Sequence, residues 1–432
     1  MQRDLSWRQR FVAAFDPYRA LSPDECKALY VDRVGSPAAR IVEALEEGGG
    51  QARVALVGAR GSGKSTELRQ VMHRLSEDGA PLVPILVDIG EGLPEKATTV
   101  AWLPVVAAAA RAAREDWDGI VPKGDPLPGA LKAIGIGAEV LSGLLRVVRS
   151  VGPWLGPKGL TAAGAAGALE PASEVLARAA RDASVSEPAR AELDAVVAAL
   201  RQELSSLGEA AGRGVVLLLD GLDKRPTADS VFEALSEADL LLGLPAAVVV
   251  SGPMQLQLDG RFAAYLTPGR FQPLTVHNIP VVRRDGAPRP AGIALLVDLY
   301  ERRWRDATLG PALLPLPQVT VAARWSSGIV REFLTLVRDA GKAALRAGHD
   351  QVDDDDLGLA VRERRHTMEI TLDATRWSVL AAVLRDRERP SRELDDLMLQ
   401  NAIVCYQNDS IWYRPNELLV PYLEHRPGGA TG

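Results

Sequence analysis

Four largely apolar runs predict strands that are buried on both faces of a sheet. They cover residues 54–57, 82–89, 215–219 and 246–250, and glycine, proline or charged residues stand close to both ends of each. Short apolar runs with such boundaries are typical of parallel strands whose two faces are covered. Because a segment with helical spacing of apolar residues directly follows the first run, the pattern predicts an α/β fold with a parallel sheet flanked by helices.

A glycine-rich loop joins the first predicted strand to this helix. Its sequence, GARGSGKS, fills every position of the pattern G-x-x-x-x-G-K-[ST] for a phosphate-binding loop. The glycines are expected to supply backbone conformations that other residues avoid, so that amide groups can surround an anion. The helix start adds unpaired amides and the positive end of a dipole. The predicted nucleotide-binding residues are Gly58, Ala59, Arg60, Gly61, Ser62, Gly63, Lys64, Ser65 and Thr66.

Three side chains of this loop have distinct expected roles. Lys64 places a compact positive charge on the β and γ phosphates, and Ser65 offers its hydroxyl to Mg²⁺. Thr66 supplies ordinary polarity at the helix start. A chance glycine-rich turn is the alternative, but the strand before the loop and the helix after it make that alternative weak. ATP and Mg²⁺ are therefore the expected ligands.

A second candidate element is the aliphatic run Val215–Leu219, which ends in Asp220. Ligands of open α/β sheets bind at the carboxyl ends of the strands. We expect Asp220 to hold Mg²⁺ through its water shell and Asp223 to orient or deprotonate the attacking water. Ser251 ends the next aliphatic run, and contact with the γ phosphate and an ordinary strand-end hydroxyl are equally weighted for it.

The sequences GARGSGKST and LLLDGLDK together resemble the AAA+ and STAND groups of P-loop ATPases. The resemblance implies that the strand AAVVVSGP is the sensor 1 strand, with Ser251 as its polar residue. The segment WSSGIVREFLTLVRDAGKAALRAG is similar to the lid helix of initiators and clamp loaders. Gly328 and Arg331 stand there at the positions of a Gly-x-x-Arg motif, which implies a sensor 2 role for Arg331. The resemblance spans about residues 30–425 and becomes less specific toward the C-terminus.

One departure from this family concerns the magnesium strand. AAA+ enzymes usually carry Asp-Glu there, whereas Gly221 follows Asp220 in this chain. The departure favours slow turnover and makes a nucleotide switch credible. An arginine that enters a neighbouring subunit's site is a further expectation for oligomeric AAA+ proteins. Arg261 and Arg270 lie in the expected interval, but a surface or ion-pairing role is the favoured interpretation for both.

The predicted domains follow these motifs. Residues 1–48 are predicted to form an N-terminal helical segment, and within it the stretch 22–47 reads as two helices separated by Gly35-Ser36-Pro37. The P-loop ATPase domain covers 49–285, with a helical Gly/Ala-rich insertion at about 118–211, and a helical lid follows at 286–366. The C-terminal part, 367–432, reads as helix, helix, two-stranded hairpin and helix, which resembles a winged helix.

The insertion raises the question of membrane contact. Charged residues interrupt its apolar stretches, so a transmembrane span is not expected. An amphipathic helix from Ala133 to Val151 offers peripheral membrane contact as an alternative, and a helical hairpin that covers the protein's own core is favoured. The uncharged stretch from Leu240 to Leu258 is bracketed by prolines and predicts a loop, a core strand and a loop. The carboxylates of residues 353–356 are expected to cap a helix rather than to bind metal.

Composition limits the partners. The 432 residues carry a net charge of −6 and a pI near 5.6, so the chain has no overall attraction for nucleic acid or anionic membranes. Residues 367–432 hold seven arginines, no lysine and ten acidic residues, which favours protein contact over DNA contact. Two distant cysteines, Cys26 and Cys405, and an N-terminus without a signal peptide predict a cytoplasmic location.

The sequence therefore predicts an ATPase that acts as a molecular switch. Nucleotide state would control homo-oligomer assembly or contact with a partner protein, and by analogy alone the role would be in bacterial signalling or phage defence. Two alternatives stay open at this point. One is a DNA-binding initiator or loader, and the other is a nucleotide-stabilised scaffold with negligible turnover.

Overall fold

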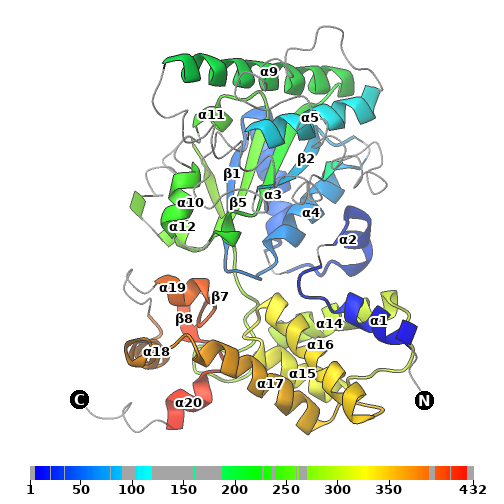
Figure 1. Ribbon diagram of the computed structural model, residues 1–432, viewed down its shortest axis with the longest axis vertical. Coiled ribbons are helices and arrows are strands. Elements are labelled where there is room, and N and C mark those ends of the chain that lie inside the picture. The colour runs from blue at the N-terminus through cyan, green and yellow to red at the C-terminus, as the bar shows by residue number, and fades with distance from the viewer. Residues whose placement is uncertain are drawn as a thin grey trace. The chain divides into compact units, whose positions relative to one another are not determined.

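The computed structural model describes residues 5–19, 21–33, 35–77, 79–89, 103–118, 160–161, 187–225, 228–235, 239–258, 260–261, 270–388, 395–408 and 410–425. The chain forms two compact units (Figure 1). We call the first the sheet unit, which comprises Gly35–Val57 and Ser65–Thr275. We call the second the helical unit, which comprises Met1–Val34, Gly58–Lys64 and Val276–Gly432.

The sheet unit is built on a six-stranded sheet in the order β3-β2-β4-β5-β1-β6. Its strands are β1 (Arg53–Gly58), β2 (Leu82–Asp88), β3 (Leu160–Thr161), β4 (Gly214–Asp220), β5 (Ala247–Pro253) and β6 (Gln272–Val276). The pairs β2–β3, β2–β4 and β4–β5 are parallel. All residues of β1 and β5 are buried, as expected for strands covered on both faces. The four predicted strands and the α/β class are thus confirmed.

Helices pack on this sheet. They are α3 (Pro37–Gly48), α4 (Lys64–Leu75), α5 (Leu103–Asp118), α9 (Glu187–Ala211), α10 (Ala228–Leu235), α11 (Asp239–Leu242) and α12 (Gln255–Leu258). The long helix α9 runs beside α5 (Figure 1), and the two contact β4 and β2 respectively. A buried ion pair of 3.0 Å between Arg114 and Glu203 joins them.

Most of the predicted insertion lies outside the described residues, including the proposed amphipathic helix 133–151. Two described parts correct or confirm the expectation of a helical insertion. Residues 187–211 are helical, as expected. Leu160–Thr161, in contrast, forms the short strand β3, which extends the sheet beside β2. Within the described part of the chain, no helix combines the length and the apolar character needed to cross a membrane.

The helical unit begins with α1 (Leu5–Ala14) and α2 (Pro23–Leu29). The two helices expected within residues 22–47 are α2 and α3, so this expectation is confirmed. Helix α1 is held by aromatic contacts rather than by a strong apolar stripe. Phe11 and Phe15 pack against Trp304 with ring centroids 6.1 and 6.2 Å apart, and the Trp7 indole donates to the Leu309 carbonyl.

Four helices follow in the region predicted as the lid. They are α14 (Pro290–Asp306), α15 (Leu316–Trp325), α16 (Val330–Ala347) and α17 (Asp354–Glu369). Arg364 on α17 donates two hydrogen bonds of 2.6 Å to Glu332 on α16. Such a bidentate pair fixes the two helices relative to each other more firmly than a single contact does.

The predicted cap at the start of α17 is confirmed. Asp353 accepts a hydrogen bond from the Asp356 amide, and the Asp356 side chain accepts one from the Asp353 amide. The hydrogen bond from the Asp356 amide lowers the pKa of Asp353. A side-chain hydrogen bond with Asp356 raises the pKa of nearby His349. One nitrogen or oxygen atom from each of these three side chains lies within 4.8 Å of the other two, and the capping bonds together with the His349–Asp356 hydrogen bond hold this arrangement.

The C-terminal part follows the predicted order of helix, helix, hairpin and helix. It contains α18 (Ala374–Asp386), α19 (Asp395–Leu399), β7 (Ile403–Asn408), β8 (Ser410–Pro415) and α20 (Val420–His425). The last helix starts four residues later than the sequence suggests. Asn416 and Glu417 instead use their polar groups to bond a turn of the lid, as described below.

Gly328 is a position where alanine should be strongly destabilising. Its φ is +69°, and a Cβ atom there would overlap the carbonyl oxygen of Ile279. Strained backbone and overpacking each cost about 1–3 kcal/mol, so we expect Gly328→Ala to lower the free energy of unfolding by about 3 kcal/mol or more. Urea unfolding measures this loss.

The matched control is Gly348→Ala. Gly348 also has a positive φ, +81°, but a Cβ atom there has open space around it. Only the conformational cost of about 1 kcal/mol should remain. Equal losses in the two variants would contradict the close approach of Gly328 to Ile279.

The thiol of Cys405 should be unreactive in the folded protein. Burial raises its pKa to about 12, and only the thiolate attacks alkylating reagents. At pH 8 the thiolate fraction would be on the order of one in ten thousand. Peptide mass spectrometry after iodoacetamide treatment should find Cys405 modified only when guanidinium is present. Modification of Cys405 in the native protein at the rate of an unfolded peptide would contradict this prediction.

Candidate nucleotide-binding site

The glycine-rich loop lies between β1 and α4, as predicted. Gly61 and Gly63 have φ angles of +81° and +101°, which side-chain-bearing residues rarely adopt. Gly58 does not share this conformation, so our expectation for it needs correction. A Cβ atom at Gly58 would lie 2.7 Å from the Val276 carbonyl oxygen and 2.9 Å from the Ser62 hydroxyl. Gly58 is therefore needed for close packing at the base of the loop rather than for a special backbone conformation.

Lys64 curls back over this loop. Its ammonium group donates to the carbonyl oxygens of Gly58, at 3.0 Å, and Ala59, at 2.9 Å. Only 3% of the residue is exposed. Beside it, the buried Ser62 hydroxyl has no hydrogen-bond partner among the described residues. A positive charge, an orphaned hydroxyl and two left-handed glycines fit the phosphate tail of a nucleotide.

Arg33 is a second cation at the loop, and the sequence analysis missed it. Its guanidinium group lies against Gly63, where a side chain on that residue would meet it. Arg33 also donates to the carbonyl oxygen of His277 at 3.4 Å. No motif connects Arg33 with the loop, because thirty residues separate the two in the sequence. Only the fold brings this charge to the phosphate-binding residues.

The lid helix α16 contacts the loop through its first turn. The Arg331 amide donates to the Gly61 carbonyl oxygen at 3.2 Å. A Cβ atom at Gly61 would lie 2.7 Å from the Cβ of Arg331, so only glycine permits this approach. The Arg331 guanidinium lies 5.2 Å from the centre of the Tyr18 ring, and its buried Nε has no partner within the described chain. The fold thus brings the predicted lid arginine to the loop, with its side chain held on Tyr18.

A chain of hydrogen bonds extends from the loop to the C-terminal part of the helical unit. The Asn401 amide group donates to the Arg60 carbonyl oxygen at 3.0 Å. Asn416 donates to the Asn401 carbonyl oxygen at 3.1 Å and accepts from the Ser327 hydroxyl at 3.1 Å. Ser327 stands four residues before Arg331. The loop, the C-terminal part and the lid are therefore joined by one network of buried polar groups.

Within the sheet unit, Asp220 ends β4 and is 3% exposed. The Ser251 hydroxyl donates to its Oδ1 at 2.6 Å and accepts from the Gly221 amide at 3.0 Å. Ser251 therefore orients the carboxylate, a contact that the sequence analysis did not consider for it. Arg69 on α4, also missed, lies 3.9 Å from Oδ2 and donates to the Ser65 carbonyl oxygen at 3.0 Å. These contacts hold a carboxylate at the carboxyl edge of the sheet, where a hydrated cation fits.

Gly221 explains the departure from Asp-Glu. Its φ of +113° turns the chain from β4 into a 3₁₀ turn, Leu222–Lys224, which carries Asp223. A glutamate would be strained in that conformation. Asp223 is half-buried. The next residue, Lys224, pairs with Asp88 at 2.7 Å, so the carboxylate that ends β2 has an ion-pairing role.

The two candidate trans arginines have partners within the sheet unit. Arg261 pairs with Asp229 at 2.8 Å and lies 4.2 Å from the centre of the Phe232 ring. Arg270 lies 3.5 Å from Asp239. Both side chains are about half exposed. These contacts agree with the surface, ion-pairing interpretation that the sequence favoured.

Comparisons with known proteins place these observations in context. No family model and no curated protein sequence matches the chain. Among solved structures, the Aeropyrum pernix ORC1 protein in complex with DNA is similar at 17% identity and a TM-score of 0.42, over 97% of this chain and 96% of that one. Drosophila ORC bound to DNA is similar at 15% identity and a TM-score of 0.41, over 99% and 94%. The Thermotoga maritima RuvB Holliday junction branch migration motor is similar at 14% identity and a TM-score of 0.26, over 55% and 83%.

Proposed function

We propose that this chain is an ATP-hydrolysing switch of the AAA+ type, in which nucleotide binding at the glycine-rich loop changes assembly or contact with a partner protein. One observation carries the proposal. The loop that holds Lys64 accepts hydrogen bonds from the lid, through Arg331, and from the C-terminal part, through Asn401. A triphosphate that binds this loop must therefore act on both parts, because it competes for or reshapes the same short backbone segment.

The proposed chemistry assigns one task to each side chain. Lys64 exchanges its contacts with loop carbonyls for the β and γ phosphates, and the loop amides bind the remaining oxygens. A bound Mg²⁺ would supply positive charge that offsets the charge of the phosphates. Ser65 and Asp220 would hold it. Asp223 takes a proton from water as the water oxygen bonds to the γ phosphorus and the bond from that phosphorus to ADP breaks.

Two further residues would report the nucleotide state. Arg331 would leave Tyr18 and bind the γ phosphate, which draws the start of α16 onto the nucleotide. Ser251 would respond through Asp220, to which it donates a hydrogen bond. Turnover should be slow, because Gly221 leaves the site without the second carboxylate that usually adjoins the magnesium-binding aspartate in AAA+ enzymes.

Sizing the full chain tests the proposal. The mass of the particle in solution should differ between the ADP-bound and the analogue-bound chain. The analogue is a nonhydrolysable ATP, and the difference in mass would come either from self-assembly or from a bound partner protein. Asn401→Ala removes the bond to Arg60 and should change the distribution between these states by about fivefold or more, since coupling free energies are typically 1–3 kcal/mol.

Gln407→Ala is the matched control, because Gln407 is an exposed residue on the neighbouring strand β7. It should leave the nucleotide response unchanged. If Asn401→Ala and Gln407→Ala respond to nucleotide like the unmodified chain, coupling through Asn401 is refuted. If ATP and ADP give one particle size in all variants and no partner binds differently, the switch itself is refuted.

DNA binding by an initiator-type or loader-type ATPase is the second candidate. The order of α18, α19, the β7–β8 hairpin and α20 supports it, since winged helices with this order read DNA. The Aeropyrum pernix ORC1 structure and the Drosophila ORC structure both contain DNA. The excess of acidic residues in 367–432 argues against a large phosphate footprint. Retardation of duplex DNA that weakens steeply with salt, together with stimulated hydrolysis, would favour this candidate over the switch.

A further inference from the structure

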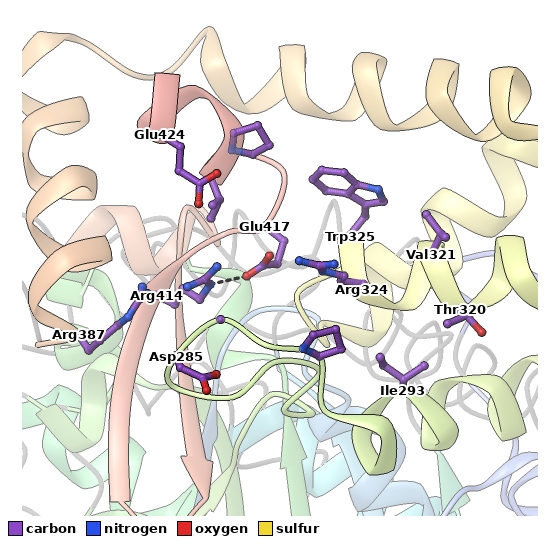
Figure 2. Close-up of a pocket in the computed structure, with 14 residues that line it drawn as sticks. Asp285, Ile293, Thr320, Val321, Arg324, Trp325, Arg387, Arg414, Glu417 and Glu424 are labelled. Atoms are coloured by element: carbon purple, nitrogen blue, oxygen red, sulfur yellow. Dashed lines mark hydrogen bonds and ion pairs between the residues drawn. The ribbon is translucent and has the colours of Figure 1, made fainter. Parts of the chain in front are cut away.

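A cavity of about 510 Å³ lies within the helical unit, between the lid helices and the C-terminal part (Figure 2). Its volume is in the range of pockets that bind small molecules. Three arginines line it. Arg324 comes from α15, Arg387 from the end of α18 and Arg414 from β8. The glycine-rich loop contributes no residue to this cavity, so its role is separate from the nucleotide site.

The arginines differ in how far they are satisfied. Arg414 is 4% exposed and pairs with Glu417. Arg387 reaches toward Arg414 in Figure 2, and its buried Nη1 has no hydrogen-bond partner among the described residues. Burial, Arg414 and Arg284 lower the pKa of Arg387, against weaker opposing effects of Glu417 and Glu424. A guanidinium in this setting lacks a counterion.

The cavity also contains carboxylates, but among the described residues none of them forms an ion pair with Arg387. Glu417 accepts from Arg414, and Asp285 accepts from the Ala287 amide at 2.9 Å. Glu424 is exposed. The donor on Arg387 therefore stays without an acceptor, and an anion that enters the cavity would provide one.

The side of the cavity formed by α14 and α15 carries apolar side chains beside Arg324 and Thr320. Val321, which is 43% exposed, and Ile293 line the cavity beside Trp325. Arg365 lies 5.5 Å from the centre of the Trp325 ring and comes from outside the cavity. A cationic end and an apolar end within one cavity suit a ligand with a charged group and an apolar body.

We propose that this cavity binds a small organic phosphate. The phosphate group would accept hydrogen bonds from Arg387, Arg414 and Arg324, and the apolar body would lie against Trp325 and Val321. The planar guanidinium group of arginine can donate two parallel hydrogen bonds to a carboxylate or to a phosphate. A dianionic phosphate is favoured here, because two guanidinium groups lie side by side and only one of them is paired. A bound ligand would join α15 of the lid to α18 and β8.

Isothermal titration calorimetry of the full chain with phenyl phosphate tests this proposal. We expect a saturable site that persists in Lys64→Ala, and weaker binding of inorganic phosphate and of benzyl alcohol, which each carry half of the recognised chemistry. Arg387→Gln and Arg324→Gln should each weaken phenyl phosphate binding by about tenfold or more, the loss expected for a charge-assisted hydrogen bond. Arg324 is exposed, so its variant should fold even if the other does not.

Two controls locate the binding. Arg385→Gln, an exposed position on α18 outside the cavity, should leave the affinity unchanged. Lys64→Ala should also leave it unchanged, because the glycine-rich loop is the other phosphate site. Binding that is lost in Lys64→Ala and kept in Arg387→Gln and Arg324→Gln would overturn the proposal. Absence of saturable binding up to about 10 mM phenyl phosphate would overturn it as well.

Discussion

Lys64→Ala is expected to lower ATP affinity by on the order of 100-fold, since it removes at least two charge-assisted contacts of about 1.5 kcal/mol each. In the structure, the ammonium group lies 3.0 and 2.9 Å from two carbonyl oxygens of the glycine-rich loop, where a phosphate would bind. After its loss, the loop amides, Arg33, Arg331 and Mg²⁺ are left to oppose the phosphate charge. Calorimetric titration with ATP and Mg²⁺ measures the effect.

Lys27→Ala is the control for this variant, because Lys27 is an exposed lysine on α2. It should bind ATP like the unmodified chain. Thermal unfolding without nucleotide tests whether Lys64→Ala is folded. If a folded Lys64→Ala variant binds ATP as tightly as the unmodified chain, the nucleotide site is elsewhere and the proposed function fails.

Asp223→Asn is expected to reduce the rate of ATP hydrolysis by about 100-fold or more, because a general base contributes that much. Asparagine keeps the size of the side chain but cannot accept the proton from water. ATP affinity should change by less than about twofold, since in our proposal Asp223 contacts neither phosphate nor metal. Release of phosphate under single-turnover conditions separates the chemical step from product release.

Asp229→Asn is the matched control for Asp223→Asn. Asp229 lies in the same unit, is largely exposed and pairs with Arg261. This variant should hydrolyse ATP at the unmodified rate. If the Asp223→Asn variant hydrolyses ATP as fast as the unmodified chain, Asp223 is not the general base. A chain that never hydrolyses ATP above background, with or without Asp223, is the scaffold rather than the switch.

The residues of the site differ in how far sequence alone could predict them. Lys64 and Asp220 were predictable, because each belongs to a contiguous pattern of strand and turn. Arg33 and Asn401 were not, since they contact the loop from segments thirty or more residues away. Arg69 carried a weak signal: it lies five residues after Lys64 on α4, one turn beyond the loop, where it meets Asp220.

The elements show the same division. Strands β1, β2, β4 and β5 were predictable, because their apolar runs leave no alternative to burial. Helix α18 was also placed correctly, at residues 374–386. Helix α1 lies within the predicted N-terminal helical segment, but only the structure gives its bounds and shows that Phe11 packs against Trp304. Strand β3 was missed because two residues are too few to show an alternation of apolar and polar positions. Only their pairing with β2 makes them a strand.

The amino-acid sequence by itself determined the chemistry that depends on neighbours along the chain: a strand, a left-handed turn with Gly61 and Gly63, and a lysine at the start of a helix. Backbone conformation and helix polarity are local, so spacing is enough to specify them. The tertiary structure alone decided what surrounds that loop. Arg331, Asn401 and Arg33 reach it from three distant segments, because packing, and not sequence separation, determines which polar groups share a buried site.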